Sequence, residues 1–121
     1  MRLNADLTRR VVVHGGKIDW VPSPIPEVKR RMLDRIGGET ARATTIVSYE
    51  PNSSFRRHVH GGGEEFLVLK GTFSDEHGDF PQGCYIRNYP TSSHEPYSKD
   101  GCVILVKLHQ MNLEDRTHVV I

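Results

Sequence analysis

The sequence predicts an all-β fold, a sandwich or barrel of short strands. Residues typical of turns recur about every eight to twelve positions, which is the spacing of such folds. Two segments, 41–49 and 102–108, are rich in β-branched or apolar residues and contain no internal glycine or proline. A chain of 121 residues can bury one core but not two. We therefore expect a single domain over residues 1–121, with N-terminal strands and an extended arm (1–39), a barrel core (40–110) and a C-terminal strand (111–121).

The N-terminal part predicts strands and one extended crossing. Val11–Val13 is expected to begin a strand, because three β-branched residues follow one another. Trp20–Pro26 contains three prolines, so we expect it to cross the surface in extended form. Residues 27–36 are ambiguous, since their apolar positions have helical spacing while Gly37-Gly38 is typical of a hairpin turn. We favour the hairpin, which leads into the strand over 41–49.

The second half of the chain predicts further strands joined by turns. Residues 51–54 turn the chain into a strand that carries two histidines. A strand over 64–70 is expected to end at a turn over Lys70-Gly71-Thr72. A loop over 75–79 and a turn over 81–83 precede a strand that begins at Cys84. The strand over 102–108 is expected to be buried.

Composition excludes several classes of protein. Lysine plus arginine (16) nearly balances aspartate plus glutamate (15), so nucleic acid is not an expected partner. No apolar segment approaches the length of a membrane span, and the N-terminus lacks the apolar run of a signal peptide. A cytoplasmic protein is therefore the expectation, with no membrane partner. In that compartment Cys84 and Cys102 are expected to be free thiols.

Four residues form a candidate metal site. His58 and His60 are two apart on a predicted strand, where alternate side chains project to the same face. After a glycine-rich connection, Glu64 opens the next strand and can bring a carboxylate to the same point. His94, about thirty residues later in a proline-flanked segment, is the expected fourth ligand. A lone His-x-His pair is more often structural, but together these residues favour a mixed nitrogen and oxygen metal site.

The spacing of these residues carries a family resemblance. His58-x-His60-x3-Glu64-x6-Gly71 resembles the first motif of the cupin superfamily. The segment Phe73–Pro81 and the Pro90-x-Ser-x-His94 form are similar to the ChrR-like cupin subfamily, and the resemblance spans residues 40–110. It implies a small double-stranded β-helix, or jelly-roll, barrel whose metal is held by the two motif histidines, Glu64 and His94. One departure is Asn52, which stands where the superfamily has a glycine but tolerates a left-handed turn.

The resemblance implies three alternative functions. Three imidazoles and a carboxylate suit one divalent transition metal, zinc or iron first, with manganese, nickel or copper also compatible. The first function is a non-haem dioxygenase that acts on a small oxygenated substrate such as a β-diketone. The second is a non-enzymatic, metal-dependent sensor of a small ligand or oxidant, and the third is a metal-free sugar-type epimerase or lyase with His58 or His94 as base.

Partners follow from the same resemblance and from the ends of the chain. We expect a small-molecule ligand or substrate. A sigma factor is not expected, because residues 1–40 lack the His-x3-Cys-x2-Cys pattern of the ChrR anti-sigma domain. A homodimer is expected, because the apolar segment 117–121 is unsuited to a free sheet edge.

The remaining charged residues are interpreted as ordinary surface groups. The acidic cluster of Asp75, Glu76, His77 and Asp79 suggests a second cation site, but we favour a polar turn because consecutive turn residues rarely converge on one ion. Three histidines without partners at ligand spacing are interpreted as ordinary, and the arginine pair as solvated rather than anion-binding. These are His14, His109 and His118, and Arg56-Arg57.

Overall fold

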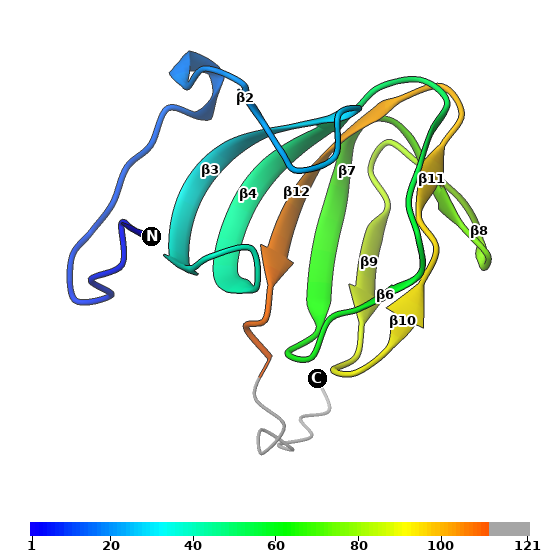
Figure 1. Cartoon of the computed structure of the whole chain (residues 1–121). Helices are drawn as coiled ribbons and strands as arrows, with labels where there is room; N and C mark the ends of the chain where they lie inside the picture. Colours follow the sequence, from blue (N-terminus) through cyan, green and yellow to red (C-terminus); the bar gives the residue numbers. More distant parts are fainter. Residues whose placement is uncertain (112–121) are drawn as a thin grey trace, which may run out of the picture.

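The computed structural model describes residues 1–111, which form a strongly curled antiparallel sheet (Figure 1). The all-β prediction is confirmed, since the one helical element is the three-residue 3-10 turn Gly15–Lys17 within the described part of the chain. The strands are β1 (Arg2–Leu3), β2 (Val21–Pro22), β3 (Val28–Gly37), β4 (Ala41–Tyr49), β5 (Ser53–Ser54), β6 (His58–Val59), β7 (Glu64–Asp75), β8 (Gly78–Pro81), β9 (Tyr85–Asn88), β10 (Ser93–His94), β11 (Tyr97–Ser98) and β12 (Cys102–Leu108).

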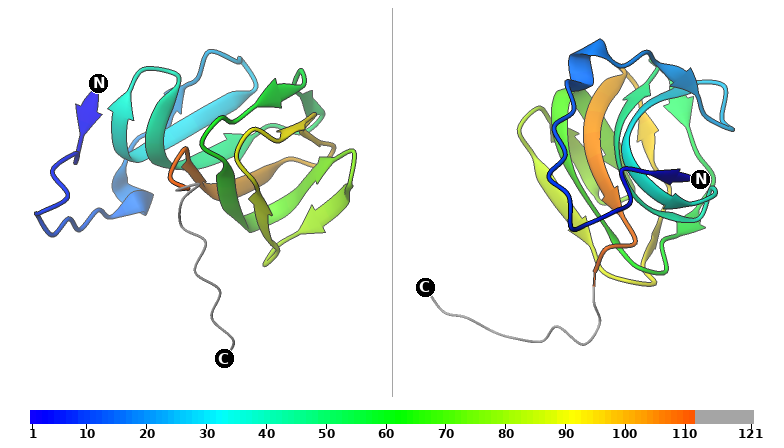
Figure 2. Two further views of the ribbon diagram at one scale, coloured as in Figure 1. Left: turned by 90° about the horizontal axis from the view of Figure 1, so that it is seen from below. Right: turned by 90° about the vertical axis from the view of Figure 1, so that its left-hand side faces the viewer.

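The strands are arranged as a cup. Neighbours in the main sheet follow the order β1-β3-β4-β12-β7-β11-β5, with β2 paired to β3, and β8 and β9 paired to β7. The four long strands β3, β4, β12 and β7 form one curved wall, and the short pair β6 and β10 lies across from its β7 end (Figures 1 and 2). Residues from both layers therefore line the interior of the cup.

The predicted hairpin is confirmed. β3 runs for ten residues and pairs with β4 through the turn after Gly37, so the helical alternative for residues 27–36 is wrong. The register between the two strands shifts between Met32 and Asp34. At this shift the carboxylate of Asp34 accepts a hydrogen bond of 2.7 Å from the Thr44 amide. The shift is a β-bulge, which locally bends and twists the sheet.

The predicted turn at residues 70–72 is wrong, because β7 continues through Gly71 to Asp75. Up to Gly71 the strand pairs with β12, and beyond it with β8 and β11. Gly71 adopts φ +75°, and a β-carbon there would collide with the carbonyl oxygen of Gly101. Only glycine tolerates both conditions easily. Gly71 thus bends one strand from the curved wall into the facing layer.

The core lies between the two layers. Phe66, Val68 and Phe73 of β7 are each at most 2% exposed, and the rings of Phe66 and Phe73 are 4.6 Å apart. Cys102, Ile104 and Val106 bury alternate positions of β12, which confirms the predicted burial for one face of that strand. The core residues of β12 thus alternate as the strand pattern requires, whereas on β7 the alternation that includes Phe66 and Val68 is interrupted at Gly71 before Phe73.

The N-terminal arm differs from the prediction. Val11–Val13 is exposed and forms no strand, so the expectation of a strand there is wrong. The Trp20–Pro26 crossing is confirmed, and β2 within it pairs with β3 at the edge of the sheet, where proline is tolerated. The predicted C-terminal strand at 111–121, on which the dimer prediction depends, lies outside the described residues beyond position 111.

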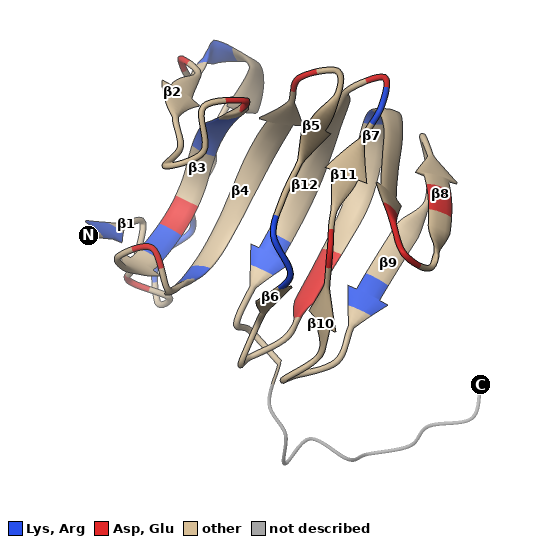
Figure 3. Ribbon diagram, turned by 45° about the vertical axis from the view of Figure 1, so that its right-hand side comes forward, with Lys and Arg blue, Asp and Glu red and all other residues tan. Residues whose placement is uncertain are grey.

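The distribution of charged residues and the state of the cysteines agree with the expectations from the sequence. Basic and acidic positions are interspersed over the ribbon rather than gathered on one face (Figure 3). Within residues 1–111, no helix has the length and apolar character needed to cross a membrane. Cys84 is half-buried, Cys102 is buried, and both are free thiols, as predicted.

Candidate metal centre

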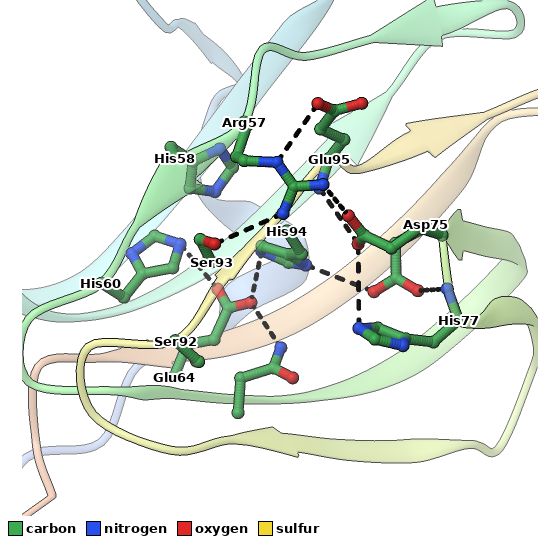
Figure 4. A network of polar contacts seen from close by, with 12 residues as sticks. Arg57, His58, His60, Glu64, Asp75, His77, Ser92, Ser93, His94 and Glu95 are labelled. Carbon is green, nitrogen blue, oxygen red and sulfur yellow. Dashed lines mark hydrogen bonds and ion pairs between the residues drawn. The ribbon is translucent and has the colours of Figure 1, made fainter.

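The three predicted histidines meet at the β7 end of the cup. His58 of β6 lies directly opposite His94 of β10 in the antiparallel register, and His60 follows two residues after His58. One ring nitrogen from each histidine lies within 4.8 Å of the others. The centroid of the His58 ring lies 4.6 Å from that of His60 and 4.9 Å from that of His94. Figure 4 shows the three rings turned toward one another.

Glu64 approaches two of these rings from the start of β7. Its side chain is almost fully buried, and its two oxygens lie 3.0 Å from His60 Nε2 and 2.9 Å from His94 Nε2. Asn88 of β9, which pairs with Glu64 across the sheet, donates a hydrogen bond of 2.9 Å to the same carboxylate. The structure therefore brings together all four residues that the sequence singled out.

The ring nitrogens have an unmet bonding capacity that fits a metal. His60 Nε2 and His94 Nε2 are buried, and neither makes a hydrogen bond of acceptable geometry with any described residue, despite the short distances to Glu64. Buried polar atoms are normally satisfied, so two unsatisfied nitrogens beside a third imidazole call for a shared partner. Imidazole nitrogens and a carboxylate are the donors that zinc, iron, manganese, nickel and copper accept. The donor set thus fits a divalent transition metal.

The protonation states of Glu64 and His58 favour binding of a cation. Burial raises the pKa of Glu64, but its contacts with His60 and His94 outweigh burial and hold that pKa well below its usual range. Burial lowers the pKa of His58, and the neighbouring imidazoles lower it further. Glu64 is therefore a carboxylate and His58 a neutral imidazole near neutral pH, which are the forms that bind metals.

Asp75 is a site residue that the sequence analysis missed. It is 3% exposed, and its Oδ2 lies 3.3 Å from His94 Nδ1, while its Oδ1 accepts a hydrogen bond from the His77 amide (Figure 4). Burial lowers the pKa of His94, but Glu64 and Asp75 outweigh burial and leave that pKa raised. A carboxylate on the far nitrogen of a ligand imidazole fixes the orientation and tautomer of the ring.

The polar-turn interpretation of the acidic cluster is confirmed, since Asp75 accepts the His77 amide of the turn, but Asp75 also contacts His94. Glu76 faces outward and pairs with Arg57, and Asp79 accepts a hydrogen bond from Ser74. The alternation of side chains along β7 could have indicated that Asp75 points inward, because Phe73, two residues earlier on the same face, is buried.

His109 also lies beside the site, although the sequence indicated no role for it. Its Nδ1 accepts a hydrogen bond of 2.9 Å from the Gly62 amide, and its ring is 5.7 Å from that of His60. A β-carbon on Gly62 would collide with the backbone of His109. Gly62 thus permits close packing of the glycine-rich connection against the end of β12.

Arg57 borders the site without being free to bind an anion. Its guanidinium pairs with Glu76 and lies 3.3 Å from Glu95, and it donates to the hydroxyl of Ser93 (Figure 4). These contacts tie the chain before β6 to the chain around β10. Arg57 therefore helps to hold the two histidine strands together. This agrees with its interpretation as a surface residue that does not bind an anion.

Two cavities that share lining residues open on the histidines. A small inner cavity of about 110 Å³ is lined by all four candidate ligands and by core residues that include Phe66 and Phe73. A larger cavity of about 600 Å³ has His58 and His60 in its wall and extends over the inner face of β3 and β4 toward Ser23–Ile25. Val47 and Tyr49 line both. A molecule in the larger cavity would therefore reach the imidazoles directly.

Comparison with protein families matches residues 8–112 to the ChrR cupin-like domain. This chain belongs to the ChrR cupin-like domain family. Comparison with curated proteins found no match. The predicted ChrR-like jelly-roll barrel is thus confirmed, and the family name applies to nearly the whole described chain.

Solved structures show the same cupin fold. ChrR from Rhodobacter sphaeroides, in complex with SigE, has a TM-score of 0.63 and 24% identity over 77% of this chain. The match covers 49% of that chain, so this ChrR-like chain spans about half the length of ChrR. An acetylacetone dioxygenase from Acinetobacter johnsonii has a TM-score of 0.65 and 19% identity, covering 83% of this chain and 72% of its own. The polyketide cyclase RemF from Streptomyces resistomycificus has a TM-score of 0.66 and 19% identity, with 84% and 81% covered.

Proposed function

We propose that this chain binds one divalent transition metal through His58, His60, Glu64 and His94, and acts as a dioxygenase-type enzyme on a small oxygenated molecule. The observation that carries this proposal is the cavity of about 600 Å³ whose wall includes His58 and His60. Purely structural metal sites are closed by their protein ligands, whereas catalytic sites keep a position open to substrate. A ligand-sized cavity that begins at two of the ligand rings supports the second kind of site.

The residues around the site have separate tasks in this proposal. His58 and His60 present ring nitrogens toward the cavity, and ionised Glu64 supplies the negative charge that a cation requires. Asp75 holds the His94 ring through its Nδ1 atom. A bound divalent ion would supply Lewis-acid polarisation of an oxygen donor, and iron would add redox chemistry with dioxygen.

The walls of the large cavity suit an organic substrate. Val47, Phe55, Val106 and Leu108 line it with apolar surface, which excludes water from around a bound molecule. Tyr49 lies between the two cavities, and burial, then the nearby Glu64, raise its pKa far above the usual value. Its hydroxyl thus stays neutral and is available as a hydrogen-bond donor to the substrate. The acetylacetone dioxygenase among the structural neighbours makes a β-diketone the first substrate to test.

A metal-dependent sensor is the second candidate. Family membership and the likeness to ChrR, which was solved bound to a sigma factor, favour a regulatory module. Glu64, as a fourth protein ligand, would also leave fewer positions for oxygen and substrate than three histidines alone. A metal-free epimerase or lyase ranks third, because it needs one base and leaves the buried group of three imidazoles and a carboxylate unexplained.

The decisive experiment is the metal content of protein purified anaerobically, measured by elemental mass spectrometry. His94→Ala is the test variant, and His14→Ala, at an exposed histidine outside the site, is the control. Stoichiometric iron that disappears only in His94→Ala, with oxygen uptake on addition of acetylacetone, supports the enzyme. Stoichiometric zinc without oxygen uptake supports the sensor, and wild-type protein that binds no metal overturns both.

A further inference from the structure

The large cavity has a cationic end away from the histidines. Arg30 and Arg35 of β3 and Thr45 of β4 line it there, and together we call them the arginine end. Arg35 is 4% exposed and Thr45 2% exposed, while the side chain of Arg30 is 14% exposed. Charged and polar side chains this deeply placed in a barrel interior require partners.

The β-bulge in β3 places Arg35 on the same, inward face as Arg30. Residues five apart on a regular strand point to opposite faces, because side chains alternate with period two. The register shift between Met32 and Asp34 inserts one extra residue, so Arg30 pairs with buried Val47 and Arg35 with buried Ala43. Figure 3 shows the basic segments of β3 on either side of the acidic Asp34 position.

The charge at the arginine end is not balanced by the protein. Glu39 is the one carboxylate of the described residues that pairs with it, at 3.0 Å from Arg30 and 3.9 Å from Arg35. The Glu39 side chain is 64% exposed, so water screens much of this attraction. Burial and the neighbouring Arg30 lower the pKa of Arg35, an effect that Glu39 only partly opposes. Two inward cations therefore face a single exposed anion.

Two donors at the arginine end are also unpartnered. Thr45 Oγ1 and Arg30 Nε are buried, and neither finds a hydrogen-bond partner among residues 1–111. A buried hydroxyl or guanidinium N–H without a partner is costly, and native structures contain few of them. Both belong to residues that line the same cavity. Their positions indicate that an acceptor of hydrogen bonds binds there.

We propose that the large cavity binds a small carboxylic acid with an apolar body, whose carboxylate contacts Arg30, Arg35 and Thr45 and whose far end points toward His58 and His60. Guanidinium groups match carboxylates in charge and geometry. Between the two ends the cavity wall is apolar, and it includes Val28, Val47, Phe55, Val106 and Leu108.

The register of the sheet sets the length of such a ligand. Arg35 pairs with Ala43, Ala43 with Leu108, and Leu108 with Glu64, so a single row of residues joins the arginine end to the metal centre. Three strand spacings correspond to about 14 Å along the sheet, and side chains shorten the gap from both sides. This favours acids with a body of medium length, such as octanoate or 4-phenylbutyrate.

This inference names the substrate class of the proposed function and rests on it for the role of the histidine end. Its test is calorimetric titration of zinc-treated protein with octanoate and 4-phenylbutyrate, each compared with its neutral amide. The variants are Arg30→Gln and Thr45→Val, and the control is Arg42→Gln, which removes the same charge from an exposed position on β4.

We expect both acids to bind the wild type and Arg42→Gln alike, and to bind Arg30→Gln about tenfold or more weakly, because a charge-assisted contact is lost. Thr45→Val should weaken binding several-fold while leaving resistance to urea unchanged or higher, because its hydroxyl has no partner among the described residues 1–111. A purely structural role for Thr45 would not produce this combination.

Equal binding of acids and amides, equal acid binding by wild type and Arg30→Gln, or no acid binding by the wild type would overturn the inference. A carboxylate that bound the metal instead would leave Arg30→Gln unaffected. The same titrations without zinc separate the two proposals. If the wild type fails to bind metal but still binds acids in a way that depends on Arg30, the proposed function is refuted and this inference stands. If the wild type binds stoichiometric metal but its acid binding does not depend on Arg30, this inference is refuted and the proposed function stands.

Discussion

Asp75→Asn tests whether the hairpin carboxylate orients the metal centre. Asn keeps the size of the side chain and an oxygen for the His77 amide, so the turn between β7 and β8 should survive. What disappears is the negative charge 3.3 Å from His94 Nδ1, at a position only 3% exposed where water cannot replace it. The change therefore addresses one contact of one ligand ring.

The expected loss is in metal affinity. Removing a partner of this kind typically weakens metal binding about 10- to 100-fold. The 3.3 Å contact is longer than a typical charge-assisted hydrogen bond, so we expect the lower part of that range, about 10- to 30-fold or about 1.4 to 2.0 kcal/mol. Zinc affinity, measured by competition with a chromophoric chelator, is the assay.

Asp79→Asn is the matched control. It removes the same charge from the same hairpin, but Asp79 is exposed and accepts a hydrogen bond only from Ser74. Equal loss in both variants would mean that general charge, not orientation of His94, matters. A change of less than about twofold in Asp75→Asn would refute the role that we assign to Asp75.

Four further outcomes follow from the structure. The Glu64 and Asp75 carboxylates outweigh the effect of burial and raise the pKa of His94. The His94 imidazolium therefore stabilises the metal-free fold below about pH 6.5, and this stabilisation is lost as pH rises through the raised pKa. A metal must displace that proton, so zinc affinity should increase between about pH 6 and pH 8, and constant affinity would contradict this. Burial raises the pKa of Cys102, so it should react with a disulfide reagent only after unfolding, well behind half-buried Cys84; equal rates would argue against it. Phe73→Ala should lower the free energy of unfolding by about 3 to 5 kcal/mol in urea titrations, and a loss under about 1 kcal/mol would show that Phe73 is not a core residue. Thr91 has φ +69°, which is strained for a β-branched residue, so Thr91→Asn should raise the free energy of unfolding by about 1 kcal/mol; a decrease would count against strain there.

Several features were predictable because they depend on neighbouring residues. The hairpin at Gly37 and the strand over 41–49 follow from local turn and strand preferences. Asn52 adopts φ +62°, as expected for a residue that replaces a turn glycine. The four candidate ligands were found from spacing along the chain, since strand alternation and a short turn bring His58, His60 and Glu64 together.

Other features required knowledge of which strands pair. Asp75 reaches His94 only because Gly71 bends β7 into the facing layer, where a turn had been predicted. His109 approaches His60 only because the end of β12 packs against Gly62. No local pattern around these residues states which distant segment they will contact.

By itself, the sequence determined the all-β class, which follows from composition and local preference, and the set of residues that could hold a metal, which follows from spacing. Its motifs also carried the resemblance to the ChrR-like cupins that the family comparison confirms. Tertiary structure alone decided which polar residues face the interior. A one-residue shift in register reverses the face of every side chain beyond it, and the bulge in β3 does this to Arg35 relative to Arg30. That shift, which strand pairing and not local sequence produces, places Arg35 on the same face as Arg30, so that both line one cavity whose wall also includes the candidate ligands His58 and His60.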